Sequence, residues 1–171
     1  MIIAKPLQHD TPEYCKYYIA LIKETDLIDA LLISRDKTVK LFSSISSEKE
    51  TFYYDEGKWT IKQVLSHIIE CERIYIYRAL RFSRKDNTDL EGFEENIYAV
   101  NSNTSERGIK DLLDEYISVR ESTIIFYNYL SYDMLDFKAK ANNVFFTPRT
   151  IGWMAAGHNK HHNNIIKERY L

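Results

Sequence analysis

Four of the five histidines lie in two segments whose apolar residues recur at helical spacing. His158 and His162 are four residues apart, so they differ by only about 40° around a helix and can reach one metal ion together. His161 could compete with His162, but the apolar residues centre the buried stripe near His158 and His162 and leave His161 at its edge. We therefore predict that His158 and His162 form a pair of imidazole ligands.

His67 is the only other histidine within a predicted helix, at helical spacing between Val64 and Cys71. A buried neutral imidazole needs partners for its polar ring nitrogens, and a metal ion shared with the other pair would provide one. Catalytic metal sites usually combine three protein ligands with an open position. The sequence thus predicts one divalent ion held by His67, His158 and His162. A chance grouping of surface histidines is the alternative that spacing alone leaves open.

Glu70 lies one helical turn after His67 and is our candidate catalytic residue. A carboxylate in that position could act as a general base, or it could accept a hydrogen bond from a ligand histidine. The plainer interpretation is a salt bridge between Glu70 and Arg73 or Arg78.

Three further residues near this helix have competing interpretations. Cys71 could supply a fourth metal ligand, although three histidines with an open position make the simpler set, and a buried, inert cysteine is the ordinary outcome. Glu72 is closer to the apolar stripe, and we expect it to pair with Arg120, because a long cation among apolar neighbours needs a carboxylate. Trp59 is expected to be part of the core rather than a platform for substrate.

The helices that must position these residues follow from the apolar periodicity. Thr60 and Gln63 have the spacing of a capping box, and Thr11 followed by Pro12 suggests the start of a short first helix. Long connections span 84–105 and 131–149, the second with a possible extended piece at 143–147. We predict an all-α four-helix bundle with long crossover connections and a short extra N-terminal helix. The predicted helices cover residues 12–23, 26–45, 60–83, 105–130 and 150–168.

The composition fits one domain spanning residues 1–171. Hydrophobic residues make up 44% of the chain, and only five glycines and three prolines interrupt it, which favours long helices. A net charge of −2 gives no reason to expect a nucleic-acid partner.

Cys15 and Cys71 are far apart, which argues against a disulfide. No apolar run is long enough to predict a membrane span. We expect a cytoplasmic protein.

Three segments together resemble the DinB superfamily, which includes the YfiT-like metalloenzymes. They are WTIKQVLSHIIECERIYIYRALRFSR, LEGFEENIY and GWMAAGHNKHHNNIIKERYL. The most specific anchors are Trp59, followed eight residues later by His67, and the GHxxHH pattern near the end of the chain.

The resemblance implies a four-helix bundle with nickel or zinc at one end. The ion would be bound by one histidine of the second bundle helix and two of the last, which here are His67, His158 and His162. It further implies a metal-dependent enzyme with a small-molecule substrate, such as a transferase that joins a low-molecular-weight thiol to small electrophiles. A metal-dependent hydrolase and a non-catalytic metal-binding stress protein are the alternatives. Whether the chain forms a homodimer stays open.

Overall fold

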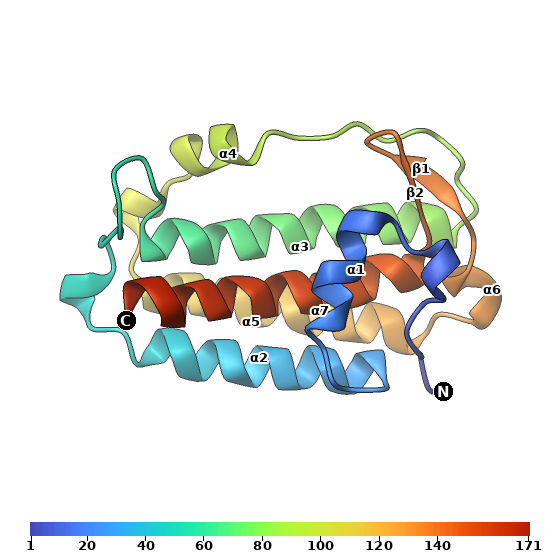
Figure 1. Cartoon of the computed structure of the whole chain (residues 1–171), viewed down its shortest axis with the longest axis horizontal. Helices are drawn as coiled ribbons and strands as arrows, with labels where there is room; N and C mark the ends of the chain where they lie inside the picture. The colour runs from blue at the N-terminus through green and yellow to red at the C-terminus, as the bar shows by residue number, and fades with distance from the viewer.

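The computed structural model describes all residues, 1–171, and has four long helices that run side by side as a bundle (Figure 1). The short helix α1 (Glu13–Ala20) packs against the last of them. The predicted all-α bundle with an extra N-terminal helix is therefore confirmed. The long helices are α2 (Leu27–Ser43), α3 (Ile61–Ser83), α5 (Ile109–Asn128) and α7 (Pro148–Ile165), and a final π-helical turn covers Ile166–Tyr170. None of the helices has the length and apolarity needed to cross a bilayer.

The starts of the helices agree only in part with the predicted ones, and α5 begins at Ile109, four residues after its predicted start. The predicted capping box opens α3, with the Gln63 amide donating to the Thr60 hydroxyl and the Thr60 amide donating to the Gln63 side chain. At α7, Thr147 is the cap and Pro148 the first residue, so this helix begins two residues before the predicted start. The prediction for α1 was wrong, because Pro12 occupies the cap position and the Thr11 hydroxyl donates to the Leu7 carbonyl instead.

Both long connections contain regular structure. The first holds α4 (Glu95–Asn101), which lies along α3 in Figure 1. The second holds α6 (Tyr132–Leu135) and an antiparallel hairpin of β1 (Ala139–Ala141) and β2 (Val144–Phe146), so the extended piece expected at 143–147 is β2. Backbone hydrogen bonds of Leu90 to Lys140 and Asn142 join the two connections. The first connection is thereby fixed in place beside α3.

A layer of buried polar residues divides the core into two apolar halves. Cys71, Ala79 and Phe82 of α3 belong to one half, whereas Ile61 and Leu65 of the same helix belong to the other. All four long helices contribute to the layer between them. We call these residues the polar layer: Ser34, Thr38, Glu72, Tyr116, Arg120, Asn159 and Asn163.

Candidate metal centre

The polar layer is built around a buried ion pair. Nε and Nη2 of Arg120 donate to the two carboxylate oxygens of Glu72, each at 2.7 Å, and both side chains are inaccessible to solvent. Nη1 of Arg120 donates to the Leu31 carbonyl at 3.1 Å. The predicted pairing of Glu72 with Arg120 is therefore confirmed, and this pair links α2, α3 and α5.

Two asparagines attach α7 to the polar layer and fix its rotation. Nδ2 of Asn159 and Nδ2 of Asn163 donate to the Thr38 hydroxyl of α2 at 3.0 and 2.7 Å. His158 and His162 each precede one of these asparagines by one residue, which places them about 100° away around the helix. With the asparagines held toward α2, the two histidines face α3, the helix that carries His67.

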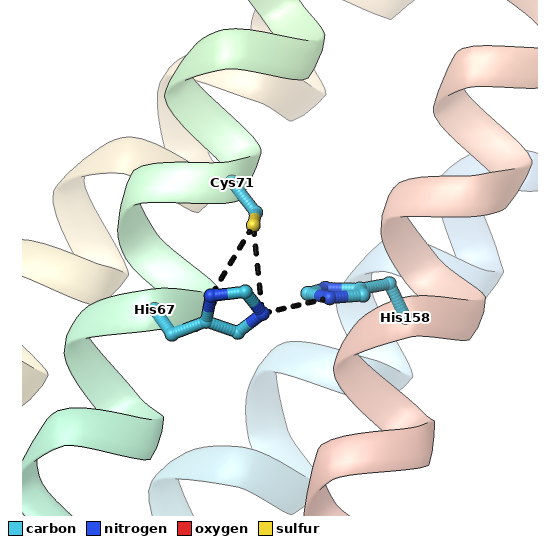
Figure 2. A group of neighbouring side chains, drawn as sticks. All are labelled: His67, Cys71 and His158. Carbon is cyan, nitrogen blue, oxygen red and sulfur yellow. Dashed lines mark hydrogen bonds between the residues drawn. The ribbon is translucent and has the colours of Figure 1, made fainter. Parts of the chain in front are cut away.

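The three predicted ligands lie together between α3 and α7, with His158 between the other two. Nε2 of His158 lies 3.2 Å from Nε2 of His67 and 3.1 Å from Nε2 of His162. His67 and His158 are buried, His162 is half-buried, and Figure 2 shows the rings of His67 and His158 pointing toward each other from the two helices. The structure thus brings together side chains that are 91 residues apart in the chain.

The donor set fits one ion better than it fits hydrogen bonds among the rings. An imidazole nitrogen has either one hydrogen or one lone pair, so Nε2 of His158 cannot bond well to both neighbours at once. Nitrogens placed tetrahedrally at about 2.0–2.1 Å from a zinc ion are separated by about 3.3 Å. The observed separations of 3.1 and 3.2 Å are close to that value.

The protonation state of the three histidines also suits a metal. Burial lowers the pKa of His67 to about 4 and that of His162 to about 2, with smaller contributions from neighbouring histidines. The pKa of His158 is likewise far below its usual value, mainly because the ring is fully buried. All three rings are therefore neutral at neutral pH, which is the form that binds metal ions.

Cys71 offers an alternative ligand. Its Sγ lies 3.6 Å from both ring nitrogens of His67 (Figure 2), and it forms with His67 and His158 a group whose ligand atoms lie within 4.8 Å of one another. Burial raises the pKa of the Cys71 thiol to about 12. Metal binding by this group would first require the thiol to lose its proton, whereas the three neutral histidines need no such change.

His161 lies apart from the three predicted ligands, as its position at the edge of the apolar stripe suggested. Nδ1 of His161 is 3.1 Å from the Tyr17 hydroxyl, and its ring packs edge-on against Tyr17 and Tyr18 of α1. His161 therefore contributes to the contact between α7 and α1.

Glu70 does not reach the histidines in the structure. Its carboxylate accepts a hydrogen bond from the Ser66 hydroxyl at 3.1 Å and lines neither cavity beside the histidines. The geometry gives no support to Glu70 as a catalytic base. The salt bridge expected for Glu70 is not formed, because Arg73 pairs with Glu115 at 2.8 Å and Arg78 donates to the Glu91 carbonyl.

The carboxylate nearest the candidate site belongs to Glu95, a residue that the sequence analysis missed. Oε2 of Glu95 lies 3.9 Å from Nε2 of His67, and the side chain is more than half exposed at the start of α4. The segment LEGFEENIY contains this residue, but no periodicity in the sequence indicates which part of a long connection crosses over α3. Hydrogen bonds from the α3 side chains of Gln63 and Arg78 to carbonyls of this connection, and those of Leu90 to the hairpin, hold it in that place.

Two separate cavities adjoin the histidines. One, of about 310 Å³, is bordered by His158, Cys71 and Glu95, and three tyrosines and Phe93 form part of its wall. The other, of about 250 Å³, is bordered by His162 and Trp59. Trp59 packs against one apolar half of the core, as expected, but it is only half-buried, and its ring centre lies 4.6 Å from that of His67. A small molecule could therefore approach the histidines from either cavity.

Comparisons with known proteins agree with this architecture. No curated protein sequence matches the chain. Among solved structures, the chain is similar to YfiT from Bacillus subtilis, a probable metal-dependent hydrolase with an unusual four-helix bundle topology. The two share 15% identity with a TM-score of 0.76, over 96% of this chain and 90% of that one, which is a likeness of fold. The sequence profile of the DinB superfamily matches residues 30–166, and the chain therefore belongs to the DinB superfamily.

Proposed function

We propose that this protein is a metal-dependent enzyme that hydrolyses a small molecule, with one divalent ion, nickel or zinc, held by His67, His158 and His162. The observation that carries the proposal is the convergence of three neutral imidazoles with a carboxylate, that of Glu95, 3.9 Å from the group. A bound ion of this kind supplies Lewis acidity, which polarises a substrate oxygen and lowers the pKa of a nucleophile.

Glu95 would act as the general base. Its carboxylate makes no hydrogen bond to the protein, so both oxygens are free to accept a proton from a water molecule. The tyrosines and Phe93 in the wall of the 310 Å³ cavity would contact the apolar part of the substrate. The description of YfiT as a probable metal-dependent hydrolase supports the same reaction class by analogy.

A thiol transferase is the second candidate, and the cavities favour it in one respect. One cavity borders His158 and the other borders His162, which offers separate places for a low-molecular-weight thiol and for the electrophile that it would attack. Three neutral histidines also add no negative charge to balance a divalent ion, which favours an anionic partner such as a thiolate.

The test begins with metal analysis of protein purified without a polyhistidine tag, where we expect about one divalent ion per chain. Hydrolysis of a panel of esters and amides is then compared with conjugation of several thiols to a reactive aromatic acceptor. Glu95→Gln should lower hydrolytic kcat by about 100-fold without loss of metal, because general-base catalysis contributes about that much. Glu70→Gln is the matched control and should leave kcat unchanged.

The outcomes separate the candidates. Turnover that requires a thiol and is insensitive to Glu95→Gln would favour the transferase. Protein that binds no divalent ion under any loading condition would contradict both proposals.

A further inference from the structure

Arg78 is a buried cation that forms no ion pair within the protein. It belongs to α3, is only 8% exposed, and borders the 310 Å³ cavity that also contains His158. A guanidinium has five N–H donors, but the only hydrogen bond of this one runs from Nη2 to the Glu91 carbonyl at 2.7 Å. Arg78 forms no ion pair with any carboxylate of the protein.

The other buried arginine shows what a structural guanidinium requires in this fold. Arg120 binds both oxygens of Glu72 and also donates to the Leu31 carbonyl and the Asn159 side chain. Arg78 has a single hydrogen bond, so its remaining guanidinium donors are available to a ligand in the cavity that it borders. A ligand that pairs with Arg78 would lie in this cavity and carry negative charge.

The surroundings of Arg78 narrow the chemistry of that partner. Arg78 is the only cation among the cavity residues, and the tyrosines Tyr14, Tyr18 and Tyr75 stay neutral because burial raises their pKa. Glu94 and Glu95 lie on the α4 side of the cavity and would repel an anion there. An anionic group therefore has one favourable place, at the guanidinium.

The arrangement also suits a ligand that reaches the histidines. Arg78 follows His67 by eleven residues, or about 16 Å along the helix, and side chains on a helix lean toward its N-terminus. The guanidinium borders the same cavity as Cys71 and His158. A molecule of metabolite size could contact both ends of a cavity of about 310 Å³.

We propose that Arg78 binds a carboxylate of the substrate, and that the substrate is a small carboxylic acid with an aromatic or apolar body. The planar guanidinium matches a carboxylate in a two-point contact, with the anion held at Arg78 and the rest of the molecule directed toward the histidines. The inference rests on the proposed function in that it assigns the substrate class of the same site.

The test compares 3-phenylpropionate with 3-phenylpropan-1-ol, a pair of probes that differ in charge and little in shape. Binding to the full chain is measured by calorimetry, both in the zinc-loaded and in the metal-free protein. We expect the acid to bind at least about tenfold more tightly than the alcohol in both forms, because one charge-assisted hydrogen bond contributes about that much to binding. Arg78→Gln should abolish this preference, and Arg78→Lys should retain part of it.

Two controls keep the result interpretable. Arg84→Gln makes the same change of charge at an exposed position of the same region and should leave the preference intact. Binding of the alcohol, together with circular dichroism, reports whether each variant is folded. The ratio of the acid affinity to the alcohol affinity then distinguishes a loss of charge recognition from a general loss of the cavity.

The outcomes also separate this inference from the proposed function. An acid preference that persists in Arg78→Gln, or that is present only in zinc-loaded protein, would mean that the carboxylate contacts the ion, and would overturn the inference. Absence of acid binding to the unaltered protein would overturn it as well. A preference that depends on Arg78 in protein that binds no zinc would support the inference while the proposed function failed.

Discussion

The side-chain oxygen of Asn159 accepts a hydrogen bond of 3.0 Å from Nη2 of Arg120, and the residue before Asn159 is the candidate ligand His158. The orientation of the histidine group is therefore coupled to an ion pair in the core. The polar layer that divides the two apolar halves of the bundle also sets the direction in which α7 presents its histidines.

Removal of one member of the Glu72–Arg120 ion pair should destabilise the fold strongly. Glu72→Leu leaves Arg120 charged and buried without a partner, and we expect a loss of about 3–5 kcal/mol in the free energy of unfolding. The double variant Glu72→Leu with Arg120→Met should lose less, because no uncompensated charge remains. Urea unfolding followed by circular dichroism measures both, and a double variant less stable than Glu72→Leu would show this account to be incorrect.

Zinc binding should depend on His67, His158 and His162 and not on His161. We expect His67→Ala, His158→Ala and His162→Ala each to weaken zinc binding by more than about 100-fold, because loss of an outer partner of a ligand alone costs about 10–100-fold. His161→Ala, whose ring faces Tyr17, should bind zinc like the unaltered chain. Competition with a chromogenic chelator gives the affinities. Cys71→Ser is the companion variant, and a loss of binding there as large as in His162→Ala would favour the His–Cys–His set.

The stability of the metal-free protein should fall as the medium becomes acidic. The pKa of His67 drops to about 4 in the folded chain and that of His162 to about 2, from an ordinary 6.5, because burial disfavours the charged ring. Below pH 6.5 the unfolded chain therefore takes up protons that the folded chain does not, which favours unfolding. The free energy of unfolding should decrease between pH 6.5 and 4 by up to about 1.4 kcal/mol per pH unit for each such histidine.

Substitution tests the origin of this pH dependence. His67→Gln should give a shallower decline over the same range, whereas His9→Gln, at an exposed position, should leave the slope unchanged. If the slope is the same in the unaltered protein and in both variants, groups other than His67 cause the pH dependence.

Gly157 should not tolerate a side chain. A Cβ atom there would lie 2.2 Å from the carbonyl oxygen of Tyr18, so α1 would have to move away from α7. We expect Gly157→Ala to cost about 1–3 kcal/mol, as overpacking does elsewhere, and to weaken zinc binding through displacement of Tyr18 beside His158. Gly108→Ala is the comparison, since its nearest neighbour would be 3.9 Å away. Thermal unfolding and zinc titration of both variants provide the measurement.

The sequence by itself determined those features that depend on the geometry of a single helix. The angle between successive residues is the same in every α-helix, so the spacing of His158 and His162 placed them on one face and left His161 at its edge. The capping box at Thr60 and Gln63 is equally local. Even the pairing of Glu72 with Arg120 was predictable, because a buried cation among apolar neighbours needs a carboxylate.

Only the tertiary structure decided which groups from other segments meet the histidines. Glu70 is close to His67 in the sequence but turns toward Ser66, whereas Glu95 comes from the connection of residues 84–105 and approaches His67 to 3.9 Å. That connection is held by hydrogen bonds from α3 side chains and by bonds to the β1–β2 hairpin, some 50 residues later in the chain. Such long-range contacts leave no periodic signal in the sequence, so the carboxylate beside the histidines and the unpaired Arg78 became visible only in the folded chain.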